Sequence, residues 1–342
     1  MAKKKNDYWA KRFRAEEEYM RKKADIEVKM IVEEYEKSLS TIEKDISNWY
    51  SRLMNNNNIS LTEARKQLNN KELKEFKWTV EEYISYGRKN AISGEFMKEL
   101  ENASARYHIS KLEALEVEIR AQINFLYEKL DGQIEQFLIN TYKDNYYRSV
   151  FTVQKGLEIG SKISALNPDM ISKVIKKPWL ADKTFSMRLW GDRDSLINTL
   201  HTELSQIMIR GEGYQDAINK ISQKFNVKKV NAVRLVYTES AAYQSSSRKQ
   251  CFNDLGIEKY EIIATLDIVT SDLCRSLDKK VFKMSEYVVG VTANPFHPNC
   301  RTTTAPYFED GKGYRAARSE NGKTYYVPDD MGYKEWFKKF VS

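Results

Sequence analysis

Cysteine, histidine and proline are scarce in this sequence: its 342 residues include three cysteines, three histidines and six prolines. The cysteines are odd in number and widely spaced, which argues against a disulfide framework and favours a reducing compartment. No apolar run approaches the roughly 18 residues of a membrane-spanning helix. The basic N-terminus also lacks the apolar stretch and cleavage site of a secretory signal. We therefore expect a globular protein without a membrane span or a disulfide scaffold.

Proline and glycine are rarest in the first part of the chain, where residues 1–150 contain no proline and three glycines. Such a composition favours helix. Apolar residues spaced alternately by four and three over 28–53 predict a long helix with a packed seam. A second stripe over 112–137 predicts another long amphipathic helix. Between them, the asparagine run at 55–60 predicts a loop, and a stripe over 73–84 predicts a further helix.

Turn signals become more frequent after about residue 155. Asn167 and Pro168 have the pattern of an N-cap followed by a first-turn proline, and the short helix that they open should end before Pro178. Further helices are predicted at 195–210, 214–225 and 231–255, and Gly256 should end the last of them in a left-handed conformation.

Beyond residue 257 the apolar period shifts from that of a helix to that of a strand. Strands are predicted at 259–267, 279–282, 287–291 and 301–308. The fold class is therefore α+β: a mainly helical region at 1–155, a small module with a short antiparallel sheet at 156–308, and a tail at 309–342 that ends in a short helix.

Two of the three cysteines and one histidine gather near the C-terminus. Cys274 lies 23 residues before His297, and two residues separate His297 from Cys300 on a proline-rich turn. This spacing can close on one zinc ion, which prefers thiolate and imidazole ligands. A structural zinc site normally has four ligands, and Asp272 or Asp278 is the candidate for the fourth.

Two other interpretations of this region stay open. In the first, Asp267, Thr270 and Asp278 only cap a tight turn and the cysteines are simply buried. In the second, a three-ligand zinc site with an open position is catalytic. The turn contains no glutamate to serve as general base, and the chain has no Gly-rich phosphate loop, GxSxG or HExxH motif. We therefore expect no enzyme.

The other unusual residues have plain interpretations. His201 and His108 are isolated, and Cys251 is expected to be a small buried apolar residue. The net charge is +8, and a basic arm opens the chain. This arm predicts weak, sequence-independent binding to double-stranded DNA, or else a solvated helix end. Its basic residues are Lys3, Lys4, Lys5, Lys11, Arg12 and Arg14.

Four segments together resemble the minor head, or head-morphogenesis, family of tailed phages, typified by protein F of phage Mu. They are TES at 238–240, ATLD at 264–267, TSDLCRSLDKKVF at 270–282 and PFHPNCR at 295–301. Within them the resemblance marks Glu239, Asp267, Thr270, Asp278 and Arg301 as structural positions of the module. Many relatives have glycine where Lys279 stands, some have a second cysteine where Ser271 stands, and many have proline at Asn294.

The resemblance implies a virion protein in the capsid interior, present in few copies at or near the portal vertex and incorporated in the host cytoplasm during head assembly. Its implied partners are the portal protein, the capsid or scaffolding protein, and packaged or ejected DNA. The alternative is a zinc-dependent hydrolase or toxin-like module that uses Cys274, His297 and Cys300.

Overall fold

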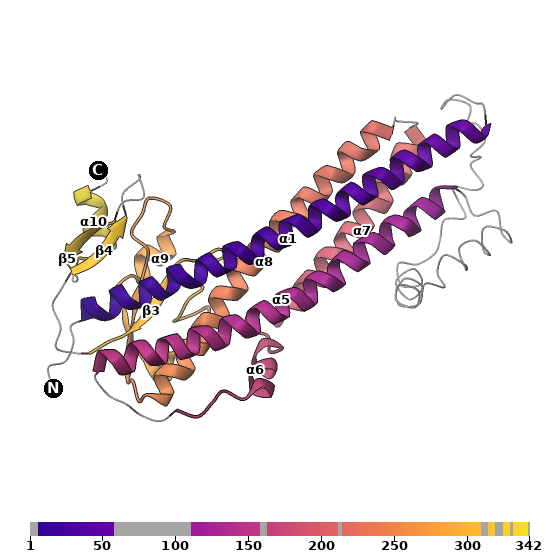
Figure 1. Ribbon diagram of the computed structural model, residues 1–342. Helices are drawn as coiled ribbons and strands as arrows, with labels where there is room; N and C mark the ends of the chain where they lie inside the picture. The colour runs from indigo at the N-terminus through magenta and orange to yellow at the C-terminus, as the bar shows by residue number, and fades with distance from the viewer. Residues whose placement is uncertain are drawn as a thin grey trace. The chain divides into compact units, whose positions relative to one another are not determined.

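The computed structural model describes residues 6–57, 111–157, 163–210, 214–308, 314–318, 324–328 and 331–340. Its helices are α1 (Asn6–Asn57), α5 (Lys111–Leu157), α6 (Pro168–Ile175), α7 (Phe185–Arg210), α8 (Tyr214–Asp254), α9 (Asp272–Leu277), α10 (Tyr333–Phe340) and the 3₁₀ helix η1 (Met284–Glu286). Its strands are β1 (Lys259–Ile263), β2 (Val281–Lys283), β3 (Thr303–Pro306), β4 (Tyr314–Arg318) and β5 (Thr324–Pro328) (Figure 1). Long helices followed by a small antiparallel sheet confirm the predicted α+β class.

The chain forms two compact units, and both are discontinuous in sequence. The first consists of Met1–Val28, Ile134–Phe185 and Arg234–Ser342, and the second of Lys29–Gln133 and Ser186–Val233. The boundaries predicted at residues 155 and 308 divide the chain into consecutive segments instead. Helices α1, α5 and α8 contribute one part of their length to each unit.

In the part of the second unit that the structure describes, segments of α1, α5, α7 and α8 bury their apolar stripes. On α1, Tyr35, Ile42 and Ile46 of the predicted seam are buried, and the hydroxyl of Tyr35 donates a hydrogen bond to that of Tyr127 on α5 at 3.0 Å. At the start of the seam Ile31 is fully buried, whereas the predicted Val32 is half-buried. The true helical period of 3.6 residues therefore carries the stripe away from a strict alternation of four and three.

The first unit encloses a core rich in aromatic residues. Trp9 and Phe13 of α1, Tyr146 of α5 and Phe252 of α8 pack with Tyr260 of β1 in one cluster of buried residues. The N-terminal helix therefore belongs to the same core as strands that follow it by about 250 residues. Burial of aromatic rings contributes a large part of the stability of such a core.

The three-stranded sheet of the first unit has the order β2-β1-β3, and both pairings are antiparallel. Tyr260 of β1 lies opposite Phe282 of β2 and Pro306 of β3. The predicted strand at 287–291 is wrong. The carbonyl oxygen of Val288 accepts hydrogen bonds from the backbone N–H groups of Val291, Thr292 and Ala293, so a tight turn satisfies the groups that a strand would have offered to a neighbour.

The remaining differences lie at the ends of elements. Helix α7 begins ten residues before the predicted start at 195, α8 is continuous where two helices were predicted, and α1 continues to Asn57 through part of the predicted loop. The tail contains a hairpin of β4 and β5 that the sequence analysis missed. The predicted helix at 73–84 lies outside the described residues. None of the described helices combines the length and the apolar composition that crossing a membrane requires.

Local signals were correct at two turns. The side chain of Asn167 accepts a hydrogen bond from the backbone N–H of Asp169 at 2.8 Å, and Pro168 occupies the first turn of α6. After α8, Gly256 has φ +66. This left-handed conformation favours glycine.

Candidate metal centre

Two loops of the first unit bring the candidate ligands together. Cys274 lies in the first turn of α9, where the side chain of the N-cap residue Ser271 accepts a hydrogen bond from the backbone N–H of Cys274 at 3.2 Å. The second loop is the turn from His297 to Cys300, which is closed by the bond from the Cys300 N–H to the His297 carbonyl oxygen at 3.2 Å. Ser271 therefore serves as the N-cap of α9.

The three predicted ligands converge. The Cys274 sulfur lies 3.1 Å from Nε2 of His297 and 3.7 Å from the Cys300 sulfur. All three ligand atoms lie within 4.8 Å of one another. Both cysteines are only 2% exposed, and they pack with Ala264 and the partly buried Phe296.

The imidazole of His297 is oriented for a ligand at Nε2. Its Nδ1 lies 2.8 Å from the carbonyl oxygen of Pro298. Since a carbonyl oxygen only accepts, Nδ1 must carry a proton, and the neutral ring then presents the lone pair of Nε2 to the two sulfurs. Metal-binding histidines commonly make this kind of hydrogen bond through the nitrogen that does not touch the metal.

The donor set fits zinc. In a tetrahedral site with Zn–S bonds of about 2.3 Å, two sulfurs lie about 3.8 Å apart, and the observed separation is 3.7 Å. Among the described residues the cluster contains three ligand groups. Cys274 and Cys300 would hold the zinc as thiolates, and His297 would hold it through its imidazole.

Neither candidate for a fourth ligand joins the cluster. The side chain of Asp272 is 96% exposed and pairs with Arg275 at 3.1 Å. Asp278 accepts a hydrogen bond from the backbone N–H of Ala264 at 2.9 Å. Asp278 therefore holds the strand end that packs against the two cysteines, and this is the turn-capping role of the alternative interpretation.

Contacts among the three side chains shift the pKa of each one. The hydrogen bond from Cys274, followed by that from His297, holds the pKa of Cys300 well below that of an ordinary thiol. The same contact with Cys300 raises the pKa of Cys274, and burial adds to this effect. Cys300 also raises the pKa of His297. An entering divalent cation would displace the thiol protons, so its affinity would depend on pH.

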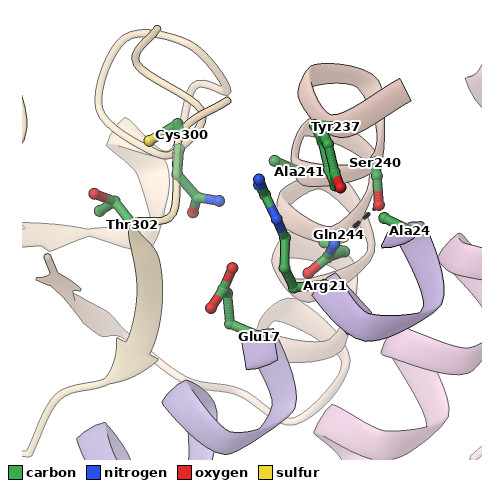
Figure 2. A pocket seen from close by; sticks show the side chains of 10 residues that line it. Glu17, Arg21, Ala24, Tyr237, Ser240, Ala241, Gln244, Cys300 and Thr302 are labelled. Atoms are coloured by element: carbon green, nitrogen blue, oxygen red, sulfur yellow. Dashed lines mark hydrogen bonds between the residues drawn. The ribbon is translucent and has the colours of Figure 1, made fainter. Parts of the chain in front are cut away.

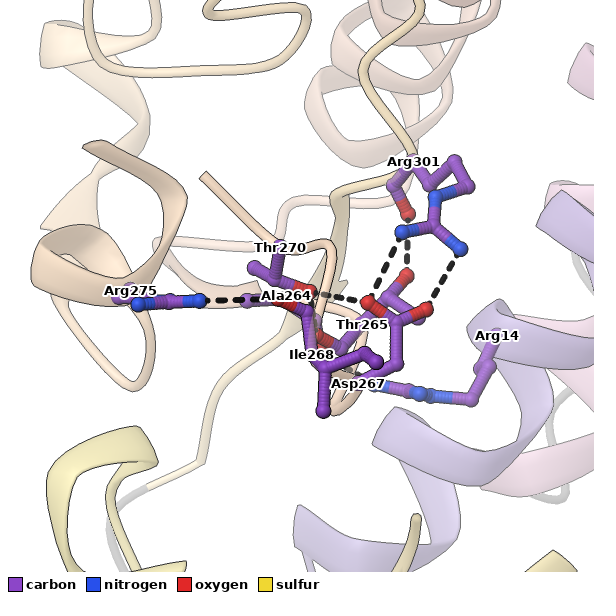
Figure 3. A network of polar contacts seen from close by, with 8 residues as sticks. All are labelled: Arg14, Ala264, Thr265, Asp267, Ile268, Thr270, Arg275 and Arg301. Atoms are coloured by element: carbon purple, nitrogen blue, oxygen red, sulfur yellow. Dashed lines mark hydrogen bonds and ion pairs between the residues drawn. The ribbon is translucent and has the colours of Figure 1, made fainter. Parts of the chain in front are cut away.

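A polar network centred on Asp267 braces the loops that carry the cysteines (Figure 3). Arg301 donates two hydrogen bonds to the Asp267 carboxylate, at 2.6 and 2.9 Å. The Thr270 hydroxyl lies 2.8 Å from the same carboxylate and 2.6 Å from the carbonyl oxygen of Thr265. Because Arg301 directly follows Cys300, this network fixes the turn to the segment between β1 and α9.

The N-terminal helix reaches the same segment through Arg14. Its guanidinium donates a hydrogen bond to the carbonyl oxygen of Ala264 (Figure 3), and Arg14 is buried. The prediction of a solvated basic arm is therefore wrong at Arg14. Lys11 and Arg12 are exposed, and Lys3, Lys4 and Lys5 lie outside the described residues.

Other residues singled out in the sequence have structural partners. Glu239 is buried and its carboxylate accepts a hydrogen bond from Nε1 of Trp179 at 2.8 Å. His201 lies 3.0 Å from the carboxylate of Glu116. Cys251 is buried in the aromatic core of the first unit, apart from the other two cysteines. His108 lies outside the described residues.

A small polar cavity adjoins the Cys300 turn, and sequence reasoning missed it (Figure 2). Glu17 and Arg21 line it from α1, and buried Asn294 lines it with its Oδ1 unpaired. The Arg21 guanidinium lies over the Tyr237 ring, 3.7 Å from its centroid. Burial raises the pKa of Glu17 to about 7. The four-residue spacing of Glu17 and Arg21 was the only local signal, and surface ion pairs have the same spacing.

Long helices that precede a small sheet with a Cys-His-Cys turn define the chain as an α+β protein with a C-terminal module built around this turn. Residues 198–305 match the family model described as Phage Mu protein F like protein. The resemblance seen in the sequence is thus confirmed, and residues 198–305 carry the module of this family.

Two curated relatives have different names. Minor head protein GP7 of Bacillus phage SPP1 is 27% identical over 270 residues, which cover 71% of this chain and 85% of that protein. NAD(+)–arginine ADP-ribosyltransferase EFV of Enterococcus faecalis (strain ATCC 700802 / V583) is 23% identical over 250 residues, 68% of this chain. The match spans only 50% of the length of the transferase. No solved structure matches the chain.

Proposed function

We propose that this protein is a structural component of the phage head that is incorporated at or near the portal vertex, in the capsid interior, during assembly in the host cytoplasm. The observation that carries the proposal is the similarity to minor head protein GP7, which extends over most of both chains. A match over 71% of the chain is longer than residues 198–305, so it extends beyond the segment that the family model matches. The partners that we propose are the portal protein and the capsid or scaffolding protein.

Assembly of heads with and without the portal tests this placement. The full-length chain is co-expressed with the major capsid, scaffolding and portal proteins of its phage, and its amount in purified procapsids is measured. We expect few copies per particle, and loss of the protein from particles assembled without the portal. Equal incorporation in both kinds of particle would move the contact to the capsid or scaffolding protein, and absence from both would overturn the proposal.

The Cys-His-Cys cluster is proposed as a structural zinc site that stabilises the C-terminal module. Its cysteines are enclosed, as in structural sites, whereas catalytic zinc keeps an open position for water or substrate. Binding energy at a site that exists only in the folded chain adds to folding stability. The zinc would therefore fix the α9 loop to the turn before β3.

Metal analysis of four purified proteins tests the zinc site. We expect about one zinc per chain in the wild type, in Cys251→Ser and in Asp272→Asn, and loss of zinc in Cys300→Ser. Cys251→Ser is the matched control, because it removes a buried thiol outside the cluster. Zinc retained in Cys300→Ser, or absent from the wild type, would leave the residues as a plain turn.

The alternative is an enzyme, either a zinc-dependent hydrolase at Cys274, His297 and Cys300 or a toxin-like module. The name of the Enterococcus faecalis relative supports the second form. Incubation with labelled NAD⁺ and an arginine-containing protein distinguishes these functions. We expect no transfer of label. Transfer that depends on His297 would favour an enzyme.

Weak contact with DNA is a further part of the proposal, and it is now restricted to Lys3, Lys4, Lys5, Lys11 and Arg12. Each phosphate contact made by a basic residue steepens the salt dependence of binding by about one unit of logarithmic slope. Alanine at Lys3, Lys4 and Lys5 together should lower the slope for duplex DNA. An unchanged slope, or no binding of the wild type at low salt, would contradict a DNA-binding arm.

A further inference from the structure

We propose that Cys274 and Cys300 form a reversible disulfide when the metal is absent and a small oxidant is present. This inference rests on the proposed function in two respects: bound zinc would block the reaction, and the virion would carry the two cysteines into an oxidising medium. The pair would thus have two alternative cross-links, a zinc ion shared by two thiolates or a direct bond between the sulfurs.

The geometry of the pair carries the inference. The two sulfurs are 3.7 Å apart, and a disulfide requires about 2.05 Å. Rotation about the Cα–Cβ bonds of the two cysteines is the movement that would close the remaining distance of about 1.7 Å. The cysteines are 26 residues apart in the sequence, so the bond would tie α9 to the turn that precedes β3.

The surroundings favour this pairing over others. Both sulfurs are enclosed, with 2% of each cysteine exposed, so bulky thiols and disulfides have no direct access. The third cysteine, Cys251, lies in a separate cluster of the core. His297 contacts the Cys274 sulfur through Nε2 and can accept a thiol proton as the sulfur reacts.

Hydrogen peroxide is an oxidant small enough for this site. One sulfur attacks a peroxide oxygen, the O–O bond breaks, and the thiol proton leaves with the departing oxygen as water, giving a sulfenic acid. The second sulfur then attacks the first, the S–O bond breaks, and a second water forms with the second thiol proton. Two thiols lose two electrons, and one peroxide is reduced to two waters.

The proposed function would expose the protein first to a reducing environment and later to an oxidising one. During assembly the cytosol keeps thiols reduced and favours the metal-bound form. A released virion carries the same residues into an oxidising medium. There the disulfide would preserve the connection between the two loops after loss of the metal.

The test uses the full chain, once treated with a chelator and once loaded with zinc. Each sample receives hydrogen peroxide, its free thiols are alkylated, and its peptides are mapped by mass spectrometry. We expect the chelated protein to lose two thiols, to show linked peptides that contain Cys274 and Cys300, and to recover both thiols on reduction. Zinc-loaded protein should react at least tenfold more slowly.

Variants decide between this pairing and general oxidation. Cys251→Ser should form the same linked peptides, and Cys274→Ser should leave Cys300 without a disulfide partner. Linkage through Cys251, or oxidation of Cys274 and Cys300 to separate sulfinic acids, would overturn the inference. Disulfide formation in a protein that never binds zinc would support the redox pair and refute the metal site. Zinc binding without disulfide formation would support the metal site and refute the redox pair.

Discussion

Replacing Asp267 by asparagine should loosen the two cysteine loops far more than the same change at Asp272. The Asp267 side chain is 19% exposed and the Arg301 side chain 32%, and their two hydrogen bonds join the segment after β1 to the residue that follows Cys300. Asp272 is 96% exposed, and its ion pair is with Arg275, three residues along the same helix.

The magnitude follows from the number and burial of these bonds. Asparagine keeps the shape of Asp267 but removes its charge, so two charge-assisted hydrogen bonds become at best neutral ones. Each charge-assisted bond is worth about 1.5–3 kcal/mol against about 1 kcal/mol for a neutral one. After allowance for the partial exposure of Arg301, we expect a local cost of about 2 kcal/mol. Asp272→Asn should cost less than about 0.5 kcal/mol.

The assay is alkylation of Cys300 in native, chelated protein. The thiol is enclosed, so its reaction requires local opening, whose equilibrium rises tenfold for each 1.4 kcal/mol lost. Asp267→Asn should therefore accelerate alkylation about 30-fold, and Asp272→Asn about twofold or less. Cys251, which lies in another cluster, serves as the internal control. Equal acceleration in the two variants, or none in Asp267→Asn, would refute the bracing role of the network.

Burial raises the pKa of Glu17 to about 7 from an ordinary 4.5, so the folded protein keeps a proton that the unfolded chain releases. The free energy of unfolding should therefore fall as the pH rises from about 5 to 7. Glu17→Gln should flatten this fall, which denaturant titrations at several pH values measure. The same pH dependence in Glu17→Gln and the wild type would contradict the burial of Glu17. In α5, Gly156→Ala should cost about 1–3 kcal/mol because its Cβ would lie 2.2 Å from the Trp9 ring, whereas the control Gly132→Ala, with nothing within 4 Å, should gain up to about 1 kcal/mol. Melting curves should shift in opposite directions, and equal shifts would refute the packing. Asn167→Ala should cost about 1 kcal/mol through loss of the α6 cap, while Asn167→Asp should keep most of it; equal losses would show that the cap bond contributes nothing.

Several elements could be read from local sequence because short-range physics decides them. The Asn167 cap needs only a side-chain oxygen next to the first turn of a helix. Gly256 ends α8 because a left-handed residue there is least costly as glycine. The stripe at 112–137 predicted α5 because a helix repeats every 3.6 residues. Failures came where the same signals are ambiguous: the valines at 288, 289 and 291 favour a strand by propensity, yet the carbonyl of Val288 and the N–H of Val291 are bonded within a turn.

The sequence by itself determined the donor types and their local order, since two residues between His297 and Cys300 suffice to bring both onto one turn. Only the tertiary structure decided which acidic residues stay outside the site. Asp272 follows the N-cap Ser271 and is nearly fully exposed. The carboxylate of Asp278 accepts a hydrogen bond from the N–H of Ala264. Spacing along the chain does not fix the direction of a side chain.

The tertiary structure also decided the role of the N-terminus. A lysine- and arginine-rich start suggests a solvated arm, yet Arg14 is buried against the carbonyl oxygen of Ala264, 250 residues away. The physical reason is that Trp9 and Phe13 lie on the face of α1 that packs in the aromatic core. Arg14 directly follows Phe13, so the packing of this face also brings Arg14 into the interior. Such a contact depends on how distant segments pack, and no local pattern in residues 1–14 encodes it.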